Sequence, residues 1–143
     1  MIGILIVAHG SLADSYVECA IHVLGNRPPA LATLDFTGHA DPDERQKVLR
    51  ARLDELSARH DQPGDGILVL TDLYGATPSN TLCRVLDPGH IEGVSGVNLP
   101  MLLKAINYRD TLTLKELVAR IVEGGRDSIQ HISETMCHAA TGR

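Results

Sequence analysis

The sequence predicts an α/β protein: a doubly wound, mainly parallel sheet of four strands with helices on both faces. The first observation is an apolar run at residues 2–8, which is typical of a strand buried on both faces of a parallel sheet. A second such run lies at residues 67–71. The third observation is the alternation of strand-like and helix-like segments, which with right-handed crossovers predicts the strand order 2-1-3-4.

The first half of the chain divides into strand, helix, strand and helix. We expect the first helix to begin at Ser11, because residues 11–14 are a variant of the capping box. A second strand is expected at residues 31–36. Asp41 and Pro42 then predict the N-cap and first position of a second helix. The side chains expected to face the core from these helices are Leu12, Tyr16, Ala20, Ile21 and Leu24, then Leu49, Leu53 and Leu56.

The second half continues the alternation. Residues 62–66 break the chain before the third strand at 67–71, and Thr77 with Pro78 predicts the cap and first residue of a third helix. We expect a weaker fourth strand at 91–97 and a short helix at 100–108. Residues 113–116 form a full capping box for a last helix that stops at Gly124 and Gly125. The alternation at 128–132 predicts an antiparallel edge strand, paired with this sheet or with that of a second subunit.

Length and composition narrow the class of protein. We expect one domain over residues 1–143, with a core at 1–132 and a polar tail at 133–143. A formal charge of −5 and 3% aromatic residues argue against nucleic acid as a partner. No apolar stretch approaches the roughly 20 residues that span a bilayer, and the first strand lacks signal-peptide flanks. Cys19, Cys83 and Cys137 are interpreted as reduced packing residues of a cytoplasmic protein.

Two polar residues follow the two strands at the centre of the predicted sheet. His9 ends the first strand and Asp72 ends the third. Ligands of doubly wound sheets bind beyond the carboxyl ends of the strands, where the direction of winding reverses. An aspartate that accepts a hydrogen bond from one ring nitrogen of a histidine fixes the tautomer and leaves the other nitrogen's lone pair exposed. The pair therefore predicts a nucleophile or a base.

The helices expected directly after these residues add a phosphate-binding feature. Their free N–H groups and positive dipole ends converge on the crevice and favour an anion there. The candidate phosphate-binding residues at the two helix starts are Gly10, Ser11, Gly75, Ala76 and Thr77. A histidine nucleophile beside an anion seat indicates phosphoryl transfer through phosphohistidine, without a metal or another cofactor.

Purely structural roles remain open for the same residues. His9 and Asp72 could be hydrogen-bonded turn residues, Thr77 a simple N-cap, and Tyr74 a packing residue. His39, in the loop after the second strand, is a spare histidine at the same sheet edge. The remaining histidines are interpreted as surface or hydrogen-bonded residues: His22, His60, His90, His131 and His138.

Three segments resemble a known family. Residues 4–11 (ILIVAHGS), 68–80 (LVLTDLYGATPSN) and 93–102 (GVSGVNLPML) are similar to the mannose-family EIIA domain of the bacterial phosphoenolpyruvate-dependent sugar phosphotransferase system. The resemblance covers residues 1 to about 132. Family members commonly have a second glycine where this chain has Ala76, and Phe or Trp where it has Tyr74.

The resemblance implies a role for each site residue. His9 would accept a phosphoryl group from the carrier protein HPr and pass it to an EIIB partner, with Asp72 orienting the ring and Thr77 at the phosphate site. It also implies a homodimer in which the last strand is exchanged. Because no EIIB-like segment follows residue 143, the EIIB component is expected to be separate, and the system served could be a sugar transporter or a regulatory relay.

Three other functions stay open at the level of sequence. A small tetrapyrrole metal chelatase also begins with a strand that ends in His-Gly-Ser, and here it would need His39 to face His9. The protein could supply phosphate to dihydroxyacetone kinase. It could also be an interaction module whose partner changes when His9 is phosphorylated.

Overall fold

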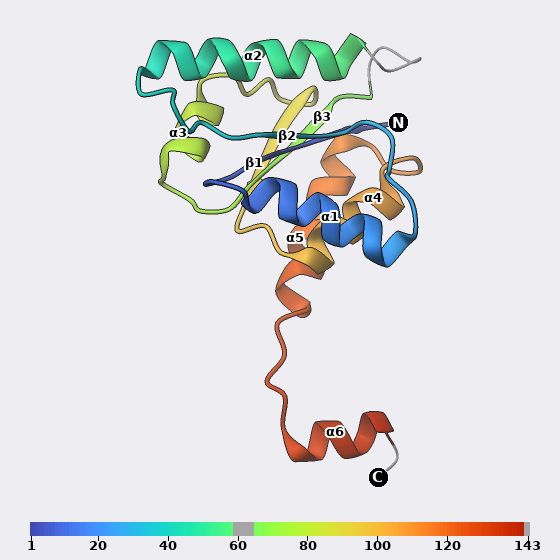
Figure 1. Cartoon of the computed structure of the whole chain (residues 1–143). Helices are drawn as coiled ribbons and strands as arrows, with labels where there is room; N and C mark the ends of the chain where they lie inside the picture. The colour runs from blue at the N-terminus through green and yellow to red at the C-terminus, as the bar shows by residue number, and fades with distance from the viewer. Residues whose placement is uncertain (59–64, 142–143) are drawn as a thin grey trace.

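The alternation of strands and helices is seen in the computed structural model, which describes residues 1–58 and 65–141 (Figure 1). Residues 62–64 of the predicted break at 62–66 lie outside the described residues, as does His60. The elements, in chain order, are β1 (Gly3–Val7), α1 (Leu12–Leu24), β2 (Leu31–Leu34), α2 (Pro42–Ala58), β3 (Ile67–Thr71), α3 (Thr77–Cys83), β4 (Ile91–Ser95), α4 (Leu99–Tyr108), α5 (Leu114–Asp127) and α6 (Glu134–Thr141).

The four strands form one parallel sheet in the order β2-β1-β3-β4, which confirms the predicted topology. The register brings the carboxyl ends of the strands to one level. Val7 pairs with both Leu34 and Thr71, and Thr71 pairs with Ser95. The residues that follow these four positions therefore share one edge of the sheet.

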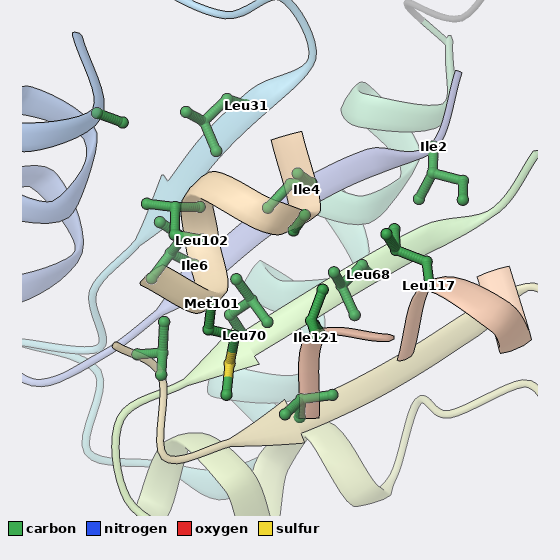
Figure 2. Packing of buried hydrophobic residues seen from close by; sticks show 14 of the residues in the cluster. Ile2, Ile4, Ile6, Leu31, Leu68, Leu70, Met101, Leu102, Leu117 and Ile121 are labelled. Carbon is green, nitrogen blue, oxygen red and sulfur yellow. The ribbon is translucent and has the colours of Figure 1, made fainter. Parts of the chain in front are cut away.

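Alternate residues of each strand enter two cores, one on each face of the sheet. Ile4 and Ile6 of β1 with Leu68 and Leu70 of β3 pack against α1, α4 and α5 (Figure 2). Leu5 and Val69 belong to the opposite core, which α2 and α3 cover. The prediction that Leu49, Leu53 and Leu56 of α2 face inward is confirmed, because all three are buried. Both faces of the central strands β1 and β3 are buried, which explains their unbroken apolar sequence.

The prediction for the inner face of α1 is confirmed at Ala20 and wrong at Leu12. Ala13, Val17 and Ala20 are its buried residues, whereas Leu12 is 40% exposed. The small side chains let the helix lie close to the sheet, and Tyr16 and Ile21 pack at the margin of the core. Ser11 occupies the N-cap position, but its side chain makes no capping hydrogen bond, so the predicted capping-box variant is not formed.

Two strands end earlier than predicted, and one helix ends later. β2 stops at Leu34 and β4 at Ser95, two residues short in each case. The capping box at Thr113 and Glu116 is confirmed, but α5 continues through Gly124 and Gly125 to Asp127. A Cβ at Gly125 would lie 2.8 Å from Cε of Met101 on α4. This glycine therefore serves close helix packing and does not end the helix.

The predicted edge strand at residues 128–132 is not formed within this chain, since none of these residues is in a strand, and its pairing with the sheet of a second subunit stays a prediction. α5 continues to Asp127, and the chain that follows it leads away from the sheet and its covering helices (Figure 1). The segment runs away from the body of the protein, with Ile129 78% and Ile132 77% exposed. The expected polar tail holds α6, which lies apart from the sheet and its helices (Figure 1).

Two further sequence expectations concern the surface. The three cysteines are exposed, so their interpretation as packing residues is wrong, and Cys19 and Cys83 carry free thiols. Among the described helices, none combines the length and apolar character needed to cross a membrane.

Candidate active site

His9 and Asp72 meet at the carboxyl edge of the sheet. Both follow paired strand ends, because Val7 of β1 lies beside Thr71 of β3. One carboxylate oxygen, Oδ2 of Asp72, accepts two hydrogen bonds from His9. The backbone N–H donates over 3.0 Å, and ring Nδ1 lies at 2.7 Å. The side chain of His9 is 57% exposed and that of Asp72 only 14% exposed. The aspartate is thus a largely covered support for a histidine that solvent and partners can reach.

The charge of Asp72 determines which ring nitrogen of His9 is available. Burial raises the pKa of the Asp72 carboxyl, but hydrogen bonds from the backbone and ring of His9, and the charge of that ring, outweigh this effect. The pKa of Asp72 therefore lies below its usual value, and near neutral pH the group is an acceptor only. Nδ1 must then be the donor in this contact, so the lone pair of the uncharged ring lies on Nε2.

The turns after the two strands use glycine where the backbone needs it. Gly10, which follows His9, has φ +57°, and Gly75, in the loop after Asp72, has φ +79°. The second loop is held by α3, where Nδ2 of Asn80 donates to the carbonyl of Gly75 over 3.2 Å. The N-cap of α3 is Ala76, one residue before the predicted cap, so Thr77 is the first helical residue. Thr77 therefore does not cap α3, and the N-cap residue Ala76 makes no side-chain capping hydrogen bond.

A cavity of about 260 Å³ adjoins His9. Its wall is formed by residues that follow β1 and β2 and by residues in the first turns of α2 and α3, namely Ala8, His9, Gly10, Asp35, Phe36, Thr37, His39, Arg45, Thr77 and Pro78. Of the predicted site residues, His9, Gly10 and Thr77 line this cavity, and Asp72 contacts His9. Ser11, Gly75 and Ala76 are not among the lining residues, and their role in phosphate binding stays a prediction.

Sequence reasoning missed Asp35 and Arg45 in the cavity wall. Asp35 follows β2 and so obeys the same strand-end rule as His9 and Asp72, but the strand was predicted two residues too long. Hydrogen bonds from the hydroxyl and backbone of Thr37 lower the pKa of Asp35, and the charges of His39 and His9 add to this. Arg45 lies on α2 and donates to the carbonyl groups of His39 and Ala40. No sequence motif marks it.

Four of the other described histidines lie on the surface, as the sequence suggested, and His39 lies at the cavity. His22, His90, His131 and His138 are exposed, and His90 and His138 lie 3.6 Å from Asp87 and Glu134. His39 lines the cavity that His9 lines, and its Nδ1 is 2.9 Å from Oε1 of Glu44. Over residues 1–58 and 65–141, no group of three or more His, Cys, Asp or Glu side chains is arranged to hold a metal ion.

Tyr74, 83% exposed, and Leu73, 59% exposed, lie in the loop that follows Asp72. Tyr74 therefore does not pack in the core of this chain. The loop presents an apolar, aromatic surface beside the His9–Asp72 pair.

Comparison with known proteins shows the same architecture and a shared sequence. A family model, EIIA-man, described as the PTS system fructose IIA component, matches residues 3–122. The mannose-specific EIIAB component of the phosphotransferase system (PTS) of Escherichia coli K12 is 34% identical over 131 residues. That match covers 90% of this chain, and the chain spans only 39% of the length of that relative. The fructose-specific EIIA component of Bacillus subtilis is 27% identical, with 94% of this chain and 88% of the relative covered.

Solved structures agree. The PTS IIA protein associated with the fucose utilization operon of Streptococcus pneumoniae has a TM-score of 0.77 at 26% identity, with 94% of this chain and 95% of that chain covered. PTS component EIIA of Streptococcus agalactiae has a TM-score of 0.76 at 26% identity, with 92% and 97% covered. The family model matches most of the chain, and the fold agrees with the solved EIIA structures. The chain therefore belongs to the mannose-type EIIA family of the sugar phosphotransferase system.

Proposed function

We propose that this protein carries phosphoryl groups within a sugar phosphotransferase system and that Nε2 of His9 is the phosphorylated atom. The observation that carries the proposal is the contact of His9 Nδ1 with Asp72 at 2.7 Å, beside a solvent-open cavity. The carboxylate keeps the proton on Nδ1 and stabilises the positive charge that the ring acquires when Nε2 reacts. Family membership supports the same chemistry.

The transfer itself needs no further reagent. The lone pair on His9 Nε2 attacks the phosphorus of the phosphorylated donor and forms a new N–P bond. The bond from phosphorus to the donor atom breaks, and that atom keeps the electron pair. The proton on Nδ1 stays on the ring and continues to donate to Asp72. A nucleophile of the acceptor then attacks the same phosphorus, and the N–P electron pair returns to Nε2.

We further propose phosphorylated HPr as the donor and a separate EIIB component as the acceptor. His9 is exposed, and so are Leu12 at the start of α1 and Leu73 and Tyr74 in the loop that follows Asp72. Exposed apolar side chains on the segments that hold a reactive, accessible histidine suit docking of another protein's active site. The acceptor could belong to a transporter or to a regulatory relay, since both would use the same chemistry at His9.

The test is a labelling experiment. The protein is incubated with labelled phosphoenolpyruvate, Enzyme I and HPr, and the label is then followed through acid and base. We expect an acid-labile, base-stable phosphate, which is the behaviour of phosphohistidine, and we expect none in His9→Ala. Addition of candidate EIIB proteins should discharge the label.

Asp72→Ala provides the second arm of this experiment. We expect it to accept phosphate about 10- to 100-fold more slowly, because the ring loses its orienting carboxylate, while the protein stays folded. An unchanged rate would make Asp72 a turn residue only. Label that persists in His9→Ala would reject the proposed site, and metal insertion into a tetrapyrrole by unlabelled protein would favour the chelatase.

A further inference from the structure

The loop after β2 and the first turn of α2 contribute two basic side chains, His39 and Arg45, to the cavity that His9 also lines. We propose that His39 and Arg45 bind the phosphoryl group carried by His9, so that the phosphate is held between His9 and the start of α2. This inference rests on the proposed function, because it concerns the phosphorylated form of His9.

His39 repeats the arrangement of His9. In each histidine, Nδ1 lies within 2.9 Å of a carboxylate oxygen, from Glu44 for His39 and from Asp72 for His9. Both rings line the same cavity. Among the described residues, Nε2 of His39 has no hydrogen-bond partner. A protonated His39 ring, with Nδ1 bound to Glu44, thus has one free N–H to offer from Nε2.

Arg45 brings a second donor to the same wall. One of its terminal nitrogens, Nη1, is bound to the carbonyl groups of His39 and Ala40, which holds the guanidinium against the His39 loop. Its Nε is buried and has no hydrogen-bond partner within residues 1–58 and 65–141. Buried donors are rarely left unsatisfied, so this N–H is a donor that the described residues leave unused. Arginine is also well suited to phosphate oxygens.

The charges around the cavity explain why these donors would act on the phosphorylated form. Asp35 lines the cavity and Glu44 contacts His39, so two carboxyl groups already lie beside these basic side chains while His9 is unmodified. Asp35 is itself engaged by the backbone and hydroxyl of Thr37. A phosphoryl group adds negative charge and acceptor oxygens to the cavity, and His39 and Arg45 are the basic side chains that line it besides His9.

The experiment measures single-turnover phosphorylation of His9 at increasing concentrations of phosphorylated HPr. The variants are His39→Gln, which removes the ring, and His39→Arg, which keeps a cation. The matched control is His138→Gln, because His138 also lies beside a glutamate, Glu134, but on α6. Thermal unfolding of each variant checks that the fold is retained.

We expect His39→Gln to lower the rate constant at saturating donor about tenfold, the effect of one charge-assisted hydrogen bond, with the half-saturating donor concentration within about twofold. His39→Arg should recover most of the rate, and His138→Gln should match the wild type. The phosphohistidine of His39→Gln should also hydrolyse at a changed rate. In ¹⁵N spectra, the ring signals of His39 should move when His9 is phosphorylated, and those of His138 should not.

Equal rate constants in His39→Gln and wild type, with unmoved His39 signals, would overturn the inference while leaving the phosphorylation of His9 intact. An effect on the half-saturating donor concentration alone would also overturn it, because His39 would then serve docking. Absence of label in the wild type would instead reject the proposed function.

Discussion

At the scale of single residues, one oxygen atom organises the site. Oδ2 of Asp72 accepts from both the backbone and the ring of His9, so the turn and the side chain are positioned by the same atom. The second oxygen, Oδ1, is buried and has no hydrogen-bond partner in the described part of the chain. The ring is therefore held at Nδ1, while Nε2 stays on the accessible side.

The lowered pKa of Asp72 predicts how stability depends on pH. In the folded protein, hydrogen bonds from His9 hold the pKa of this group below the ordinary value of 3.8. The ionised Asp72 carboxylate therefore contributes to the free energy of unfolding above about pH 4. This contribution is lost as the pH falls through the lower pKa that Asp72 has in the folded state. We expect the urea concentration at the midpoint of unfolding to decrease for the wild type as the pH is lowered below 4. This decrease should be smaller in Asp72→Asn.

Asp54→Asn is the control for this measurement, because Asp54 is exposed on α2 and has no hydrogen-bond partner among the described residues. It should follow the wild type at every pH. If Asp72→Asn and Asp54→Asn show the same acid profile, the Asp72–His9 contact does not contribute to the stability of the folded protein.

At the scale of elements, glycines set how closely neighbouring segments approach. Gly66, which precedes β3, has φ +80°, and its carbonyl accepts from the N–H of Gly3 over 3.1 Å. A Cβ on Gly66 would lie 2.9 Å from the carbonyl oxygen of His90 and 2.9 Å from Cδ2 of Leu114. The start of β3 thus depends on the absence of a side chain where three segments meet.

Gly66→Ala should therefore destabilise the protein more than its backbone angle alone requires. The matched variant is Gly25→Ala, since Gly25 has φ +81° and its Cβ would meet no atom within 4 Å. We expect Gly25→Ala to cost about 1–2 kcal/mol, the strain of the left-handed conformation. Gly66→Ala should cost about 3–5 kcal/mol, because the carbonyl of His90 cannot move aside cheaply. Equal free energies of unfolding in urea would show that the contact is relieved by a small shift.

At the scale of the whole molecule, the chain ends in a segment that is not packed on its own domain. Residues 128–133 run away from the sheet and lead to α6 (Figure 1). Ile129 and Ile132 are both more than three-quarters exposed, which is unusual for isoleucine in an extended segment. We propose that a second copy of the chain covers them in a homodimer, with this segment pairing as a strand on the partner's sheet.

The double variant Ile129→Ser and Ile132→Ser tests this assembly. We expect sedimentation analysis to show a dimer for the wild type and a monomer for the variant, because the apolar surface that drives association is lost. Val23→Ser is the control, since Val23 on α1 is also exposed, at 55%. A dimer that survives in the double variant would place the subunit contact elsewhere.

Much of this architecture follows from local sequence patterns. The unbroken apolar runs at β1 and β3 predict strands covered on both faces, and the order of strands follows from right-handed crossovers. His9 and Asp72 follow the two central strands directly, so their proximity could be predicted once that order was known. These inferences depend on hydrophobic period and on chain connectivity, which are properties of short segments.

The second half of the cavity was decided by the tertiary structure. Asp35 lines it because pairing with β1 stops at Leu34, and Arg45 lines it because of the way α2 packs on the sheet. The same holds for Gly124 and Gly125, where α5 continues and packs closely on Lys104 and Met101 of α4, and hence for where residues 128–132 lie. The apolar pattern of a segment shows which face is buried, but the end of an element depends on contacts made by its neighbours. Those contacts exist only after the chain has folded.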